Sequence, residues 1–262
     1  AYSAETDPLC RTDADSGQTV QKTDKPDQDD TADTVKNNET SDASDQSDPD
    51  TNAEEETEDD SFVIPSDAVW WGKAGVRWYF GRDGVLCFEA GELEQSSWHN
   101  ATWTITGIKV IPNKKYDKLI LPADCSRLFT NTKAKFIDAD KFDTSRVNNM
   151  EFMFAGNYDL EDLDVSGFDT SHVTNFGGMF NCCPSLKSLN VSNFDIRQAY
   201  SLEAMFRSCT GLTSLDVSGL NTSHITDMTR MFCGCESLTS LDLSSFNTIR
   251  LTDMNGMFSG CR

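Results

Sequence analysis

Cysteine is the residue type in this chain whose spacing most directly suggests chemistry. Nine cysteines occur in 262 residues, and four of them recur at intervals of 26 residues. These four are Cys183, Cys209, Cys235 and Cys261, and Asn157 stands one interval earlier. If successive intervals stack as neighbouring strands, the Cα atoms of this column lie about 5 Å apart, which is within disulfide range. Because Asn can replace Cys, the column favours small buried thiols over disulfides, and Cys233 with Cys235 is the one local pair to test.

The other reactive residues give little support for metal binding or catalysis. There is no Cys-x-x-Cys motif, and His99, His172 and His224 do not flank the cysteines at the spacing of zinc ligands. No nucleophile–base pair, phosphate-binding glycine loop or metal triad stands out. His172 and His224 hold the same place two intervals apart and are expected to be exposed polar residues. We therefore expect no catalytic residue, no metal site and no cofactor, and predict that the protein is not an enzyme.

The cysteine spacing belongs to a longer repeat of 26 residues that runs to the end of the chain without insertion or deletion. A fixed period in this range indicates a stacked-repeat architecture, in which each unit buries its apolar face against its neighbours. Such a body offers a surface rather than a catalytic pocket. The complete copies begin at Phe142, Phe168, Phe194 and Leu220, and a copy of 17 residues begins at Phe246.

The apolar positions of the repeat, numbered 1 to 26 from Phe142, predict one strand and one short helix or turn. Leu stands at positions 19 and 22 of every complete copy and Val or Leu at 24, which is the strand core of a leucine-rich repeat. Positions 12 and 13 are always Met-Phe. Positions 6, 9 and 13 are apolar at nearly helical spacing. The predicted fold is a right-handed, leucine-rich-repeat-like solenoid of parallel β-strands connected by short helices or turns.

Two polar columns follow from the same alignment. Position 2 is always Asp or Asn, mostly followed by Thr, and such segments satisfy backbone groups in turns. Positions 21, 23 and 25 should face outward from the strand, where they would form either a surface for protein, glycan or loose Ca²⁺ binding, or merely a solvated face. The ligand-binding candidates on this strand face are Asp162, Asp164, Ser188, Asn190, Ser214, Asp216, Ser240 and Asp242.

Residues 62–115 show a different pattern, which predicts a small β-rich region. The runs 76–80 and 85–88 flank an Asp-Gly turn signal and read as a hairpin, while 102–111 reads as a further strand pair or one long bent strand. We expect this region to cap the N-terminal end of the stack. The alternative is a Trp-lined carbohydrate platform, although burial is the more common fate of Trp. The tryptophans are Trp70, Trp71, Trp78, Trp98 and Trp103.

Composition divides the chain into three parts. Residues 1–61 contain 20 Asp and Glu against four Lys and Arg, so they carry most of the net charge of −21, and they contain no Trp or Phe. They cannot bury enough apolar surface to offset about 1–2 kcal/mol of backbone entropy per residue, and we expect a disordered acidic tail that extends as a stalk. The β region covers 62–115 and the repeats 116–262, beginning with a divergent copy around Leu128. The acidic charge argues against nucleic acid, and no apolar run reaches the roughly 20 residues of a membrane span.

The repeat also has a family resemblance. FDTSHVTNFGGMFNCCPSLKSLNVSN, from Phe168, resembles the repeat of the BspA-like leucine-rich family of bacterial surface proteins, also called the mycoplasma-type lipoprotein repeat. The resemblance covers about 116–262 and implies secretion or cell-wall attachment, with a role in adhesion. The chain departs from the general leucine-rich pattern in having Phe or Leu where Asn or Cys would follow the last strand Leu. The third copy also lacks Thr-Ser-x-Val.

These observations predict a secreted or cell-surface bacterial protein that mediates adhesion or ligand binding through its solenoid. The expected partners are a host extracellular-matrix protein, a mucin or another cell-surface ligand, with no nucleic acid and no membrane span in this chain. The rival interpretations are a structural spacer that presents another domain and the non-catalytic part of a larger secreted enzyme. Because the last copy stops without a capping unit, we also expect the native protein to continue beyond Arg262.

Overall fold

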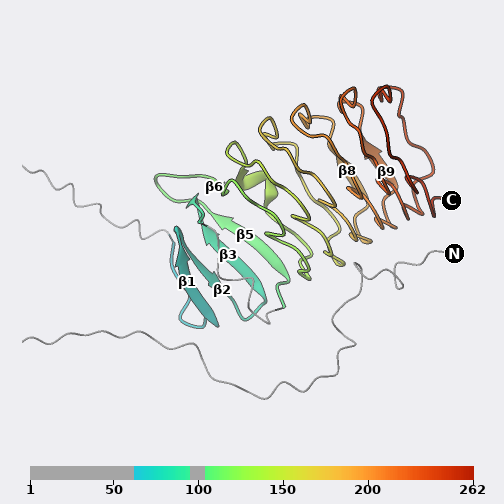
Figure 1. The fold of residues 1–262 in the computed structure, drawn as a ribbon. Helices are drawn as coiled ribbons and strands as arrows, with labels where there is room; N and C mark the ends of the chain where they lie inside the picture. The colour runs from blue at the N-terminus through green and yellow to red at the C-terminus, as the bar shows by residue number, and fades with distance from the viewer. Residues whose placement is uncertain (1–61, 95–103) are drawn as a thin grey trace, which may run out of the picture. The chain divides into compact units, whose positions relative to one another are not determined.

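The computed structural model describes residues 62–94 and 104–262. Those residues form a four-stranded β-sheet followed by a parallel β-solenoid of about five turns (Figure 1). Several sequence predictions lie outside the described residues: the acidic tail 1–61, His99, Trp98, Trp103 and the start of the strand expected from Thr102.

The four-stranded sheet has the strand order β1-β2-β3-β5. Its strands are β1 (Trp70–Ala74), β2 (Val76–Phe80), β3 (Val85–Glu89) and β5 (Gly107–Ile111). The β1–β2 and β2–β3 pairings are antiparallel, whereas β3 and β5 pair in parallel. Gly75 alone separates β1 from β2 and has a φ of 76°, which only Gly adopts without steric cost. The Asp83 carboxylate accepts a hydrogen bond from the Val85 amide at 3.0 Å and shapes the turn of the expected hairpin between β2 and β3.

The core of this sheet is continuous with the core of the solenoid. Trp78, Phe88 and Ile108 are buried in one apolar cluster that also contains the first repeat residues. Ile108 of β5 pairs with Ile137 in a parallel bridge, so the sheet and the divergent first copy share backbone pairing as well as side-chain packing. Burial of Trp78 follows from the alternating pattern of β2, which places every second residue inward.

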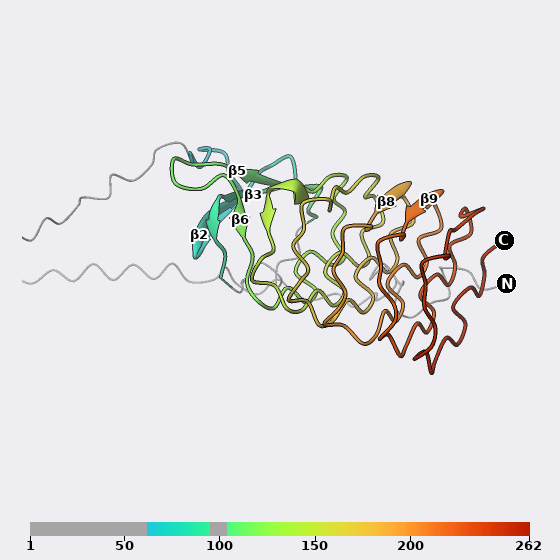
Figure 2. The same cartoon turned by 90° about the horizontal axis from the view of Figure 1, so that it is seen from above.

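The solenoid is held by short parallel pairings between equivalent positions of successive copies. Its strands are β4 (Gly91–Glu92), β6 (Leu119–Ile120), β7 (Phe142–Asp143), β8 (Ser188–Asn190) and β9 (Ser214–Asp216). β4, β6 and β7 form one sheet, and β8 and β9 form another. Isolated parallel bridges at position 8 continue the pairing, joining Asp124, Asn149 and Asn175, and joining Ser201, Asp227 and Asp253. Figure 2 shows the successive turns side by side along the stack.

Turns replace the short helices that the apolar spacing suggested as one possibility. Among the described residues, the only helix is the 3₁₀ segment η4 (Ala139–Lys141), and no helix is long and apolar enough to cross a membrane. The backbone has positive φ at positions 11 and 15 of the repeat, which is incompatible with a right-handed helix. Position 11 comprises Phe152, Gly178, Ala204, Arg230 and Gly256, and position 15 comprises Gly156, Cys182, Ser208, Gly234 and Gly260.

This backbone geometry directs hydrogen bonds from one copy to the next. The amide of Phe154 donates to the carbonyl of Met179 at 2.9 Å, and the amide of Phe180 donates to that of Met205 at 3.0 Å. In an α-helix the same amides would bind carbonyls of their own copy. The turn region therefore contributes inter-copy bonding that the short strands alone would not supply.

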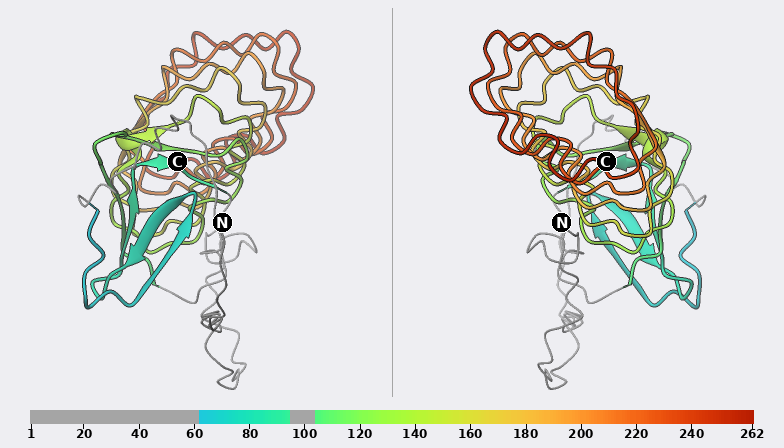
Figure 3. Two further views of the ribbon diagram at one scale, coloured as in Figure 1. Left: turned by 90° about the vertical axis from the view of Figure 1, so that its left-hand side faces the viewer. Right: turned by 90° about the vertical axis from the view of Figure 1, so that its right-hand side faces the viewer.

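Buried side chains form columns that run through the stack. The Phe rings at position 13 stack on one another with centroid separations of 5.5–6.0 Å between consecutive copies. These rings are Phe129, Phe154, Phe180, Phe206, Phe232 and Phe258. The Leu residues at positions 19 and 22 are buried in the first three copies. Viewed from the ends of the stack, successive copies follow one another with a progressive offset (Figure 3).

Candidate functional site

The strand-face candidates occupy exposed positions in successive turns of the solenoid. β8 and β9 align Ser188 with Ser214 and Asn190 with Asp216. In each of these strands the central Leu is buried between exposed neighbours, so the predicted alternation is present. The equivalent side chains of the first and fourth copies, Asp162, Asp164, Ser240 and Asp242, are also exposed. The candidates therefore form a polar face over adjacent copies.

The position 23 side chains of this face also serve their own turns. In each complete copy the side-chain oxygen accepts a hydrogen bond from the amide two residues later, at 2.8–3.0 Å. These acceptors are Asp164, Asn190, Asp216 and Asp242. Hydrogen bonds from the Ser two residues later lower the pKa of the Asp164, Asp216 and Asp242 carboxyls. The carboxylates are thus ionised and held in orientation, with only part of their hydrogen-bonding capacity available to a ligand.

Position 2 forms a second polar column with the turn-stabilising role that the sequence predicted. Asp169, for example, accepts a hydrogen bond from the Ser171 amide at 3.0 Å. The Thr at position 3 adds a link between copies: the Thr170 hydroxyl donates to the Asp195 carbonyl at 3.2 Å and accepts from the Asp195 amide at 2.7 Å. Thr170 is buried, so these bonds satisfy backbone groups that water cannot reach.

The third copy departs locally from this arrangement, as its sequence suggested. Ile196 stands in place of the buried Thr and is itself buried. A ring nitrogen of His224, in the next copy, lies 2.8 Å from the Ile196 carbonyl oxygen. Arg197 pairs with Asp195 at the surface, at 2.5 Å. His224 therefore has a structural partner in the preceding copy.

The cysteine column consists of reduced thiols, which are buried at Cys183, Cys209 and Cys235 and half-buried at Cys261, as the exchange with Asn suggested. Each thiol donates to the carbonyl of a position 13 Phe 29 residues earlier, at 3.1–3.2 Å. Burial raises the pKa of the Cys183 thiol to about 12 and that of Cys209 well above its usual value. Cys233 and Cys235 are both reduced. A buried thiol with a raised pKa is a poor nucleophile and a poor metal ligand.

No cluster of three or more His, Cys, Asp or Glu side chains among the described residues could hold a metal ion. His172 is exposed and lies 3.2 Å from the Ser171 hydroxyl of its own turn. The Ser171 hydroxyl is itself bound to Asp169 at 2.7 Å, so this local set belongs to the position 2 turn. Both histidines that the structure describes therefore interact with groups of the solenoid turns.

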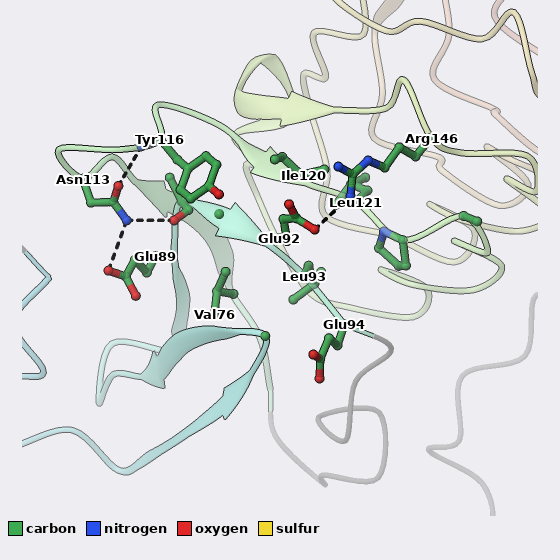
Figure 4. A pocket seen from close by; sticks show the side chains of 15 residues that line it. Val76, Glu89, Glu92, Leu93, Glu94, Asn113, Tyr116, Ile120, Leu121 and Arg146 are labelled. Carbon is green, nitrogen blue, oxygen red and sulfur yellow. Dashed lines mark hydrogen bonds and ion pairs between the residues drawn. The ribbon is translucent and has the colours of Figure 1, made fainter. Parts of the chain in front are cut away.

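The structure contains a cavity that sequence reasoning missed. It has a volume of about 510 Å³ and lies beside β4, where the β1–β2 turn approaches the first turns of the solenoid (Figure 4). It is lined by Gly75, Val76, Glu89, Ala90, Gly91, Glu92, Leu93, Glu94, Asn113, Tyr116, Ile120, Leu121, Pro122, Ala123 and Arg146. These residues come from four separate stretches of chain, so no local sequence motif predicts the cavity.

Hydrogen bonds and ion pairs hold the wall of this cavity in place. The Asn113 amide nitrogen donates to the Ala90 carbonyl at 2.9 Å and to the Glu89 carboxylate at 3.2 Å, and its oxygen accepts from the Tyr116 amide at 2.8 Å. Glu89 also pairs with Arg77 at 2.7 Å, and this interaction lowers the pKa of the Glu89 carboxyl. The loop that carries Tyr116 is therefore anchored to the end of β3.

A second ion pair crosses the cavity from β4 to the first complete repeat. The Arg146 guanidinium lies 2.9 Å from the Glu92 carboxylate, with both side chains more than half exposed. Glu94, on the same wall, forms no ion pair with another described residue and is exposed. The lining thus carries three carboxylates, those of Glu89, Glu92 and Glu94, and a single guanidinium.

Comparison with known proteins gives a family for the repeats. No curated protein and no solved structure matches the chain. One family model, described as "Mycoplasma protein of unknown function, DUF285", matches residues 123–216 and 187–262, which together span more than half of the chain. The matched residues coincide with the stacked copies of the solenoid. The chain therefore belongs to this mycoplasma-type repeat family, DUF285.

Proposed function

We propose that this protein is a secreted or cell-surface bacterial protein whose solenoid mediates adhesion or ligand binding through its strand face. The observation that supports this most is the repetition of oriented polar side chains in successive copies, from Asp164 to Asp242. Their orientation is fixed before a partner arrives, so binding would cost little side-chain entropy. A periodic polar face suits a partner that is itself extended or repetitive, such as a matrix protein or a mucin.

The likeness of the repeat to BspA-like leucine-rich surface proteins supports the same proposal. The buried Leu residues at positions 19 and 22 agree with that pattern, while the turn at positions 9 to 16 takes the place that a helix occupies in many leucine-rich repeats. We assign the protein to the BspA-like group on the sequence pattern, with secretion and surface attachment as what that group implies.

The N-terminal sheet and the acidic segment have separate roles in this proposal. The sheet caps the solenoid, because its apolar face and the Ile108–Ile137 bridge cover the first turn. Stacked repeats need such protection at an open end. The acidic segment 1–61 carries most of the net negative charge and disfavours anionic partners such as nucleic acid.

The second candidate function is a spacer that presents another domain, including the catalytic domain of a larger secreted enzyme. One observation favours it: the position 23 carboxylates already accept hydrogen bonds from the backbone amides of their own turns. A face whose polar groups serve the fold needs no ligand to explain them. The two candidates differ in whether this face contributes to binding.

The test is binding of the chain to immobilised matrix proteins, mucins and glycans, with and without Ca²⁺. The informative variant is the triple change Asp164→Asn, Asp216→Asn and Asp242→Asn, because Asn190 shows that Asn supports the same turn. The matched control is Asp143→Asn, Asp169→Asn and Asp195→Asn, which removes the same charge from position 2. We expect the first variant to lose saturable binding and the control to keep it. Equal binding by both would support the spacer.

A further inference from the structure

The cavity beside β4 is separate from the strand face. Its volume of about 510 Å³ lies within the range of small-molecule sites, roughly 300–1,000 Å³. Its walls come from the N-terminal sheet, the loop at Asn113 and the first two turns of the solenoid (Figure 4). The strand-face candidates begin further along the chain, at Asp162, and none of them lines it.

The cavity is maintained by the backbone and its hydrogen bonds rather than left by loose packing. Gly91 has a φ of 144°, and a Cβ atom there would lie 2.9 Å from a methyl carbon of Val76. Gly75 has a φ of 76°, and a Cβ atom there would lie 2.2 Å from the Glu92 carbonyl oxygen. Two stretches of chain thus approach each other closely on one side, while Asn113 anchors the loop opposite. A site held open in this way loses little free energy to rearrangement when it binds.

The chemistry of the lining selects the sign of a ligand's charge. The lining contains three carboxylates and one guanidinium, that of Arg146. Arg77, which lies outside the cavity, neutralises the Glu89 carboxylate. Glu94, two residues after Glu92 in the chain, is left as a carboxylate without an ion-pair partner among the described residues. Residues 62–262 contain 23 Asp and Glu against 18 Lys and Arg, and this net charge of −5 adds a weak attraction for cations and repulsion for anions.

The remaining lining selects the body of the ligand. Ile120, the partner of Glu92 in the β4–β6 pairing, and the ring of Tyr116 supply an apolar wall, and Figure 4 shows the Tyr116 side chain between Ile120 and Asn113. An aromatic ring can stabilise a cation by cation–π attraction. The Lys115 ammonium already lies 5.2 Å from the centre of the Tyr116 ring, so an alkylammonium group is compatible with this surface.

We propose that this cavity binds an alkylammonium group, with the charged nitrogen at Glu92 and Glu94 and the alkyl arm along Ile120 and the ring of Tyr116. Two sources share this chemistry: a free small amine and the side chain of a lysine residue in a peptide. The carboxylates hold the nitrogen, the apolar wall covers the methylene groups, and Arg146 limits the affinity by competing for Glu92.

The test uses the full chain with isotope-labelled backbone amides and follows chemical shifts during titration. The probes are n-butylamine, Nα-acetyl-lysine methylamide and, as the oppositely charged control, butyrate. We expect saturable shifts of the Gly75, Gly91 and Tyr116 amides with an amine and none with butyrate. Shifts with both amines identify a site open to lysine side chains, and shifts with n-butylamine alone identify a site for free amines. If neither amine shifts these amides, or if butyrate shifts them equally, the proposal is overturned.

Three variants separate the proposed contacts from structural effects. Glu94→Gln should weaken amine binding at least five-fold, whereas Glu203→Gln, an exposed carboxylate on the solenoid, should leave it unchanged. Arg146→Gln should strengthen binding, because it releases Glu92 from its ion pair. A loss of binding in Arg146→Gln would show that the pair maintains the cavity and would contradict the assigned role of Glu92.

Discussion

The ring of Phe206 stacks on the ring of Phe180 in the preceding copy, with centroids 5.7 Å apart and planes inclined by 4°. Phe206 also stacks on Phe232 in the following copy, at 5.7 Å. A single side chain at position 13 therefore joins three copies. Because each copy of a solenoid contacts only its neighbours, such a residue affects stability at two interfaces at once.

Replacing this ring should destabilise the solenoid strongly. Phe206→Ala removes a fully buried ring, and we expect a loss of about 3–5 kcal/mol in the free energy of unfolding. The measurement is denaturant unfolding followed by circular dichroism. Tyr200→Ala in the same copy is the control, since that side chain is 68% exposed and its loss should change stability by less than about 0.5 kcal/mol. Equal effects of the two changes would contradict the role of the Phe column.

The left-handed backbone at position 11 makes Ala204 a site for stabilisation. Ala204 has a φ of 53°, a conformation that costs an L-residue about 1–2 kcal/mol, and Gly occupies the same position at Gly178 and Gly256. Ala204→Gly should therefore raise the melting temperature of the solenoid. Ala199→Gly, at a buried position without a positive φ, should lower it. A lower melting temperature for Ala204→Gly would show that the buried methyl group matters more than backbone strain.

The Thr at position 3 should matter through its hydroxyl rather than its size. Thr170→Val keeps the volume but leaves the amide and carbonyl of Asp195 without their buried partner, which should cost about 1–3 kcal/mol. Thr174→Val removes an exposed hydroxyl that donates to the Asn148 carbonyl at 3.0 Å, and water can replace it there. Equilibrium unfolding of both variants checks this. Similar losses would refute a special role for the buried hydroxyl.

The buried thiols predict a loss of stability at alkaline pH. Burial raises the pKa of Cys183 to about 12, so the native thiol stays protonated at a pH where the unfolded thiol, with an ordinary pKa near 9, ionises. The native state then binds more protons than the unfolded state, and stability falls as pH rises above about 9. Each such thiol contributes a slope of up to about 1.4 kcal/mol per pH unit. Unfolding under reducing conditions at pH 7, 9 and 10 measures this slope, which should be smaller in Cys183→Ala than in the unchanged chain.

Much of the solenoid could be predicted because its evidence repeats in the sequence. The recurrence of Leu at positions 19 and 22 and of Phe at position 13 identifies buried columns whatever the connecting backbone does. The turn region could not be assigned with the same certainty, because its apolar spacing fits a helix and a turn equally well. The left-handed backbone at position 11 is also not evident from the sequence. Gly occupies this position only at Gly178 and Gly256, whereas the other copies have Phe152, Ala204 and Arg230 there.

The candidate sites divide in the same way. The strand face was predictable because alternation along β8 and β9 follows from local sequence. The cavity was not, because Glu94, Tyr116 and Arg146 are far apart in the chain and meet only through the packing of the N-terminal sheet on the solenoid. Gly75 and Gly91 are the sequence features most closely related to the cavity. The sequence does not show that the Glu92 carbonyl approaches Gly75 or that the Val76 side chain approaches Gly91.

The hydrogen bonds between turns run roughly along the stack, and this has a mechanical consequence. A molecule pulled at both ends along that direction would load these bonds one interface at a time, so its copies would detach in succession. Each detached copy releases 26 residues, or about 90 Å of extended chain. The solenoid would thus lengthen in regular steps under tension, and would dissipate work at every step before the last copy gave way.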